Sequence, residues 1–164
     1  MTGNAFQADG GNQYVTLGLG GEVFAVEVRA VSEILDLRPV AHMPNGPPFL
    51  MGLIDVRGRG VPVIDLRVKL GLPPAPPTEQ TRILVIDAEI AGKPEVIGLL
   101  VERVFEVTEL DNRRLEPPPE IGIRWRSDYI AGIGRRHGAF VIILGMSALL
   151  SGEEAAFLGG EVAA

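Results

Sequence analysis

Residues 44–71, PNGPPFLMGLIDVRGRGVPVIDLRVKLG, contain the pattern that decides the fold of this chain. Prolines open the stretch, and apolar runs lie on both sides of the segment Arg57-Gly58-Arg59-Gly60. Glycine adopts the backbone angles of tight turns at little steric cost, so this segment is predicted to be a sharp turn. Such a turn displays Arg57 and Arg59 at the surface, where a partner can reach them.

The same stretch ends in a short predicted helix. Asp65 is a favourable N-cap residue, Leu66 and Leu70 have helical spacing, and Gly71 begins a typical helix stop. Asp65 is therefore expected to cap the helix rather than to act as a catalytic carboxylate.

The residues before this stretch predict a hairpin followed by a helix. Residues 14–19 alternate between two faces, Gly20-Gly21 supplies a tight turn, and residues 22–28 return with the same alternation. The period then changes, because polar residues fall at helical spacing at Arg29, Ser32, Glu33 and Asp36. We expect a short amphipathic helix here, whose apolar side holds Val28, Val31 and Leu35.

The second half is predicted to consist mostly of strands. Residues 73–80, PPAPPTEQ, form a stiff linker at which the chain is expected to pass to a second lobe. Residues 82–87 contain the run ILVI, which fits a strand buried on both faces, and residues 96–107 predict one long strand in which Gly98 marks a bulge or bend. A surface loop over 110–120 follows, then a hairpin over 129–144 that turns at Arg135-Arg136-His137-Gly138, and a C-terminal helix from Met146. Residues 1–12 and 152–164 are expected to be flexible or partly helical tails.

Predicted strands outnumber predicted helices, the turns are short, and strands do not alternate with helices along the chain. The sequence therefore predicts an all-β fold, built most simply from small barrels.

Composition excludes several classes of function. The chain has 164 residues, 46% of them hydrophobic, and a formal net charge of −6, which disfavours binding to nucleic acid phosphates or anionic lipid. It has no cysteine, which excludes disulfides and thiolate chemistry. The N-terminus lacks the features of a signal peptide, and no apolar run approaches the ~20 residues of a membrane helix, so a soluble, cytoplasmic protein is expected.

The sequence offers little for catalysis. His42 and His137 fall in loops of different lobes, without the spacing of a metal site, and the serines lack a nucleophile context. We therefore predict no enzyme activity, no metal and no cofactor. A small-barrel nucleic-acid binder is a remote alternative, because an aromatic content of 5% leaves few residues for base stacking. A protein-binding module needs complementary patches rather than reactive groups, and this class fits best.

The stretch 44–71 closely resembles the signature of the CheW family of chemotaxis coupling proteins. The resemblance continues in VTLGLGGEVFAVEVRAVSEIL at residues 15–35, in RLEPPP at 114–119 and in YIAGIGRRHGAFVIIL at 129–144, and it covers residues 13–151. It implies a domain of two intertwined SH3-like five-stranded β-barrels that share a core. It also implies an adaptor that links the cytoplasmic tip of methyl-accepting chemoreceptors to the regulatory domain of the histidine kinase CheA, in membrane-associated receptor arrays.

Carried over by position, the resemblance assigns receptor binding to Val31, Glu33, Gly52 and Arg57. The kinase-facing residues of the family follow no short motif, and the resemblance indicates only the region of Val61, Val63 and Leu66.

The chain departs from the family pattern at three positions. Asp55 replaces the usual asparagine and is expected to pair with Arg59, Gly60 replaces an apolar residue, and Gly145 removes a cap from the C-terminal helix. A coupling protein for surface sensing, twitching or biofilm control is the alternative pathway.

Overall fold

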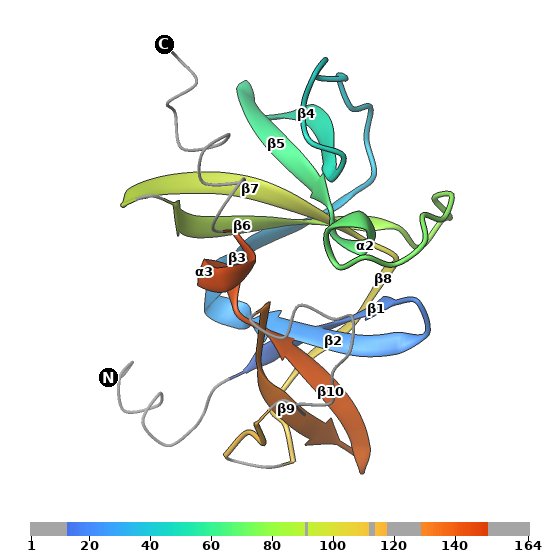
Figure 1. Cartoon of the computed structure of the whole chain (residues 1–164), viewed down its shortest axis with the longest axis vertical. Coiled ribbons are helices and arrows are strands. Elements are labelled where there is room, and N and C mark those ends of the chain that lie inside the picture. The colour runs from blue at the N-terminus through green and yellow to red at the C-terminus, as the bar shows by residue number, and fades with distance from the viewer. Residues whose placement is uncertain (1–12, 91, 112–113, 118–128, 151–164) are drawn as a thin grey trace.

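The computed structural model describes residues 13–90, 92–111, 114–117 and 129–150 (Figure 1). Within these residues, ten strands and three short helical segments follow in chain order. Their bounds are β1 Tyr14–Leu19, β2 Glu22–Glu27, η1 Val28–Ala30, β3 Val31–Asp36, β4 Leu50–Val56, β5 Arg59–Asp65, α2 Leu66–Lys69, β6 Arg82–Ile90, β7 Lys93–Val101, β8 Arg103–Thr108, β9 Ile130–Arg136, β10 Ala139–Leu144 and α3 Met146–Leu149.

The strands form two five-stranded sheets, each curled into an SH3-like barrel. Barrel A has the order β8-β1-β2-β10-β9, and barrel B has the order β3-β6-β7-β5-β4. In barrel B, the segment after β3 closes the sheet through mutual backbone hydrogen bonds between Ala41 and Leu53. In barrel A, the segment after β8 does the same between Glu116 and Ile133. The predicted all-β fold of two five-stranded barrels is confirmed.

The two halves of the chain repeat one another and exchange a hairpin. Each half runs hairpin, single strand, hairpin, helix: β1–β2, β3, β4–β5, α2 and then β6–β7, β8, β9–β10, α3. The first hairpin of each half completes the barrel formed by the other half, since β1–β2 lies in barrel A and β6–β7 in barrel B. This exchange requires two crossings between barrels, one at η1 and one at Glu102.

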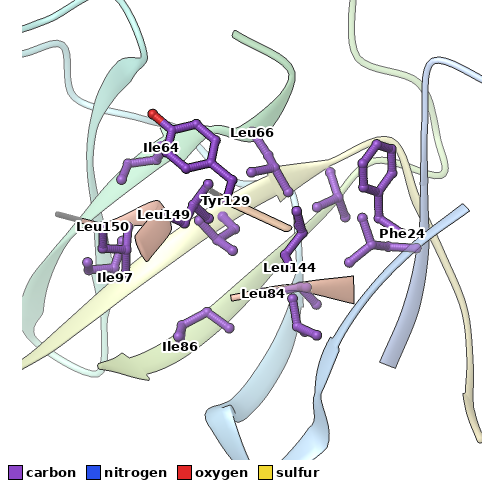
Figure 2. Packing of buried hydrophobic residues seen from close by; sticks show 14 of the residues in the cluster. Phe24, Ile64, Leu66, Leu84, Ile86, Ile97, Tyr129, Leu144, Leu149 and Leu150 are labelled. Carbon is purple, nitrogen blue, oxygen red and sulfur yellow. The ribbon is translucent and has the colours of Figure 1, made fainter. Parts of the chain in front are cut away.

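The exchange builds a core that both barrels share. One hydrophobic cluster contains Leu17 of β1, Phe24 of β2, and Leu84 and Ile86 of β6 (Figure 2). Residues of the short helices that follow β5 and β10 belong to the same cluster. Leu66 of α2 and Leu149 of α3 are fully buried in the same cluster. Smaller clusters fill each barrel separately. Burial of apolar surface stabilises a fold by roughly 25 cal/mol per Å². Burial in this shared core is therefore the main interaction that holds the barrels together.

Several predicted elements are confirmed. The turns at Gly20-Gly21 and at His137-Gly138 both have positive φ values, as two-residue hairpins of type I′ require. The residues of β6 over 83–86 are buried, with Ile83 in the barrel B cluster and Leu84 in the shared cluster on the opposite face. Asp65 caps α2 by accepting a hydrogen bond from the backbone N–H of Arg67 at 3.0 Å.

The predicted helix after the first hairpin is wrong. After the single turn η1, residues 31–36 form strand β3, whose side chains alternate between half-buried and exposed. The helical spacing of the polar residues is a coincidence. The segment forms a strand because Val31, Ile34 and Leu35 gain cross-strand partners in β6.

Three further expectations need correction. The stretch 96–107 bends at Glu102 and supplies two strands to different barrels, β7 and β8. The chain does not change barrels at residues 73–80, because β5 and β6 both belong to barrel B. Gly98 lies in regular pairing with Val85 and marks no bulge. Its role is close packing, since a Cβ there would come within 2.9 Å of the Ile83 side chain.

Candidate protein-docking site

The turn between β4 and β5 holds Arg57 in a fixed, exposed position. Arg57 and Gly58 have φ values of 53° and 82°, which define a type I′ hairpin turn with a non-glycine residue in the left-handed region. Asp55 stabilises this turn, because its Oδ1 accepts a hydrogen bond from the Gly58 backbone N–H at 2.7 Å. The expected pairing of Asp55 with Arg59 is therefore replaced by a bond to the turn backbone.

An ion pair joins this turn to strand β3. Arg57 Nη2 donates to Glu33 Oε2, and the side chain of Arg57 is 75% exposed whereas that of Glu33 is only 22% exposed. The hydrogen bond from Arg57 lowers the pKa of Glu33 below its ordinary value, and the same bond raises the pKa of Arg57. Both groups are therefore charged at neutral pH, and the carboxylate orients a guanidinium that faces solvent.

The geometry suits Arg57 to bind an acidic group on a partner. A guanidinium has five N–H donors in a planar fork, so contact with one carboxylate oxygen leaves donors for a second acceptor. Charge-assisted hydrogen bonds of this kind are roughly twice as strong as neutral ones.

Arg38 belongs to the same site, and the sequence reasoning missed it. Its Nη1 donates to the backbone carbonyl oxygen of Asp55 at 3.4 Å, and its charge contributes to the lowered pKa of Glu33. Ile34 in β3 and Leu37 just after it are 42% and 38% exposed. The sequence signal that could have predicted strand β3 is the alternation with a period of two over residues 31–36. This alternation places Glu33 and Ile34 on opposite faces of a strand.

Gly52 shapes the site from within. It is buried, has a φ of 146°, and a Cβ at this position would come within 2.0 Å of the Ala41 carbonyl oxygen. That close approach allows Ala41 and Leu53 to close barrel B. Val31, at the start of β3, is half-buried and packs against the shared core. The structure thus brings Glu33 and Arg57 together, while Val31 and Gly52 support their surroundings.

The three residues indicated for kinase binding lie in the core. Val61, Val63 and Leu66 are 1%, 0% and 0% exposed, so their side chains do not reach the surface in this conformation. Strand β5 lies within the sheet of barrel B, between β7 and β4, and Leu66 is the first residue of α2. Direct contact through these side chains is therefore contradicted by their burial.

Groups for other chemistry do not gather in the part of the chain that the structure describes. No cluster of three or more His, Asp or Glu side chains there is arranged to hold a metal ion. His42 is exposed, and His137 lies in the β9–β10 turn with a φ of 53°. None of the described helices has the length and apolar character needed to cross a membrane.

Two five-stranded SH3-like barrels that exchange a hairpin, and an exposed turn that displays Arg57, define a double-barrel protein. The model of the CheW-like domain matches residues 13–154. The chain is 29% identical to "Chemotaxis protein CheW" of Rhizobium meliloti, over 89% of this chain and 92% of that protein. It is 31% identical to "Probable chemotaxis protein CheW" of Rhizobium etli, over 88% of this chain and 91% of that protein.

A solved structure agrees with these relatives. The scaffolding protein TtCheW from Thermoanaerobacter tengcongensis superposes with a TM-score of 0.76 at 27% identity, covering 87% of this chain and 90% of that one. The chain belongs to the CheW family.

Proposed function

We propose that this protein is a non-enzymatic adaptor that couples methyl-accepting chemoreceptors to a CheA-type histidine kinase. Its membership of a family whose relatives are named as chemotaxis and scaffolding proteins supports the adaptor class. The observation that carries the receptor side is the Arg57–Glu33 pair, which holds a guanidinium at the surface in a defined orientation. The adaptor acts in the cytoplasm and joins receptor arrays by binding to receptors.

In this proposal Arg57 contacts a carboxylate or carbonyl of a receptor helix. Glu33 positions the guanidinium, Val31 borders the contact, and Gly52 allows the backbone approach that shapes this end of barrel B.

Signalling through chemotaxis is the pathway we propose. The expected phenotype on deletion of the gene is loss of swimming bias with unchanged surface motility.

The substitution Arg57→Glu tests the receptor contact. It replaces the donor with a carboxylate beside Glu33, so we expect receptor-tip binding to weaken by at least about thirtyfold, or ~2 kcal/mol. Receptor-dependent control of kinase phosphorylation should be lost. Binding is measured by pull-down with receptor tips, and control by a coupled phosphorylation assay.

Arg59→Glu is the matched control, because it makes the same charge change two residues away in an exposed position. Arg57→Asn is a second variant that tolerates the positive φ at this position while it removes the guanidinium. If both Arg57 variants keep wild-type receptor binding, or if Arg59→Glu weakens binding equally, Arg57 is not the receptor contact.

A further inference from the structure

The internal repeat gives Arg38 a counterpart in barrel A. Strand β8 corresponds to β3, because each pairs antiparallel with the first strand of an exchanged hairpin and has a register shift just before a glutamate, Glu106 or Glu33. Asp111 follows Glu106 by five residues, as Arg38 follows Glu33. The contacts that these two residues make with the neighbouring hairpin turn are therefore comparable.

In barrel A this position is held by two good hydrogen bonds. The backbone N–H of Asp111 donates to the carbonyl oxygen of Arg135 at 2.6 Å, and its Oδ2 accepts from the Gly138 N–H at 3.0 Å. Arg135 lies two residues before the first positive-φ residue of its turn, as Asp55 does in barrel B. The matching carbonyl oxygen in barrel B is therefore that of Asp55.

Arg38 makes the corresponding contact in barrel B only weakly, through its side chain. Its Nη1 donates to the Asp55 carbonyl oxygen at 3.4 Å, longer than the roughly 2.7–3.2 Å of most such bonds. Its Nε is buried and has no hydrogen-bond partner among the described residues. A buried donor without an acceptor is unfavourable, and a guanidinium carries five N–H groups. Contacts within the chain therefore leave most of the donors of this guanidinium unused.

The charges around the docking turn also leave one cation in excess. The hydrogen bond from Arg57 lowers the pKa of Glu33, and the charge of Arg38 adds to this effect, so two guanidiniums lie around one carboxylate. Glu33 is paired with Arg57, and the carboxylate of Asp55 accepts from the Gly58 backbone N–H. Among the described residues Arg38 forms no ion pair, so its charge is complementary to a carboxylate that a partner brings.

We propose that Arg38 is a second receptor contact, and that the site prefers a receptor helix with two acidic side chains about one turn apart. Residues at i and i+3 or i+4 lie on one face of a helix with Cβ atoms roughly 5–6 Å apart. Arg57 binds one carboxylate of this pair and Arg38 binds the other, each through charge-assisted hydrogen bonds. The proposal rests on the adaptor function, and it makes Arg38 a residue that determines which receptors bind.

Charge reversal with rescue tests the contact. The full chain is titrated with a purified receptor tip, and Arg38→Glu is expected to weaken binding about tenfold or more. Arg59→Glu is the matched control, because it makes the same charge change at an exposed position and should stay within about twofold. Each acidic residue of the tip is then changed to lysine in turn. We expect one lysine to restore binding of Arg38→Glu, and a different one, about a helical turn away, to restore binding of Arg57→Glu.

A double variant separates direct contact from a role in positioning the turn. Arg38→Gln removes the charge but keeps an N–H donor for the Asp55 carbonyl oxygen. If Arg38 binds its own carboxylate, Arg38→Gln combined with Arg57→Asn binds the tip at least about fivefold more weakly than Arg57→Asn alone. If Arg38 only positions the β4–β5 turn, the double variant binds no more weakly than Arg57→Asn, which overturns the proposal.

Circular dichroism melting confirms folding, and Arg38→Gln keeps the test valid if Arg38→Glu is unstable. Wild-type binding by both Arg38 variants, together with weak binding by Arg57→Glu, overturns the second contact and leaves the Arg57 contact standing. Rescue of Arg38→Glu and Arg57→Glu by the same lysine, or rescue of Arg38→Glu by none, also overturns it. Wild-type binding by the Arg38 and Arg57 variants alike would refute the receptor assignment itself.

Discussion

At the scale of single residues, Gly52 shows how backbone geometry restricts sequence at the docking site. Its φ is 146°, and a Cβ on this residue would lie 2.0 Å from the Ala41 carbonyl oxygen, which leaves no room for a side chain. We expect Gly52→Ala to lower the free energy of unfolding by at least about 2 kcal/mol, measured by urea denaturation.

Gly60→Ala is the comparison for this prediction. Gly60 lies on the neighbouring strand β5, and a Cβ there would have its nearest contact at 3.8 Å, with Leu53. We expect a change within about 1 kcal/mol, because the alanine fits and restricts the unfolded chain. Equal destabilisation by both substitutions would show that steric contact with Ala41 is not what requires glycine at position 52.

Asp111 has a role in barrel A that matches that of Asp55 in barrel B. Its Oδ2 accepts a hydrogen bond from the Gly138 backbone N–H at 3.0 Å, and this bond lowers the pKa of the carboxyl group below its ordinary value. A carboxyl group with a lowered folded pKa stabilises the protein above its unfolded pKa of about 4, and this contribution is lost as the pH falls through the folded pKa.

The difference in unfolding free energy between the wild type and Asp111→Ala should therefore be constant from pH 7 to about pH 5, and shrink below about pH 4. Denaturation curves at a series of pH values measure this difference. A difference that persists unchanged to about pH 2.5 would mean that the ionised carboxylate is not responsible.

At the scale of elements, the repeat exposes a missing cap on α3. Asp65 caps α2, whereas Gly145 at the matching position before α3 provides no side-chain hydrogen bond. Gly145 has extended backbone angles, and a Cβ there would make ordinary contacts with Ala131 at 3.6 Å. We expect Gly145→Asp to stabilise the protein by about 0.5–1 kcal/mol in urea denaturation. Gly145→Ala separates the cap from the loss of glycine flexibility, and an equal gain in both variants would argue against capping.

The elements also show what a sequence pattern can decide. Local signals predicted the hairpin turns at Gly20-Gly21 and His137-Gly138 and the cap at Asp65, because these depend on nearby residues. Strand β3 escaped prediction because its pairing with β6 connects residues about fifty positions apart, which a local period does not record. The crossings between barrels escaped prediction for the same reason, since a linker rich in proline resembles a boundary whether or not the chain changes barrel.

The candidate site was predicted in part. Glu33 and Arg57 were both named, and the structure joins them by an ion pair that a sequence separation of 24 residues does not reveal. The assignment of Val61, Val63 and Leu66 to a binding surface was wrong. Apolar side chains in a small barrel are needed to fill its core, and these three are buried there. Arg38 was missed because its contact is with the backbone carbonyl of Asp55, 17 residues further along the chain.

At the scale of the whole molecule, the exchanged hairpins make the two barrels one folding unit. Arg67 adds to this link, since it pairs with Glu102 at the second crossing, and Glu102 Oε2 accepts a hydrogen bond from the Gly20 N–H of barrel A at 3.1 Å. The Arg67 side chain is only 12% exposed, so the contact is protected from solvent. The contact therefore adds a connection between the two barrels beside the second crossing.

Co-sedimentation of the kinase with receptor-containing membranes tests the proposed coupling of kinase to receptors most directly. We predict that the kinase sediments with receptors when the wild-type chain is present, and remains largely in the supernatant when the chain is omitted or carries Arg57→Glu. The Arg59→Glu variant should support sedimentation at the wild-type level. Kinase that sediments equally with and without the chain, or that stays in the supernatant when the wild-type chain is bound to receptors, would contradict the adaptor function.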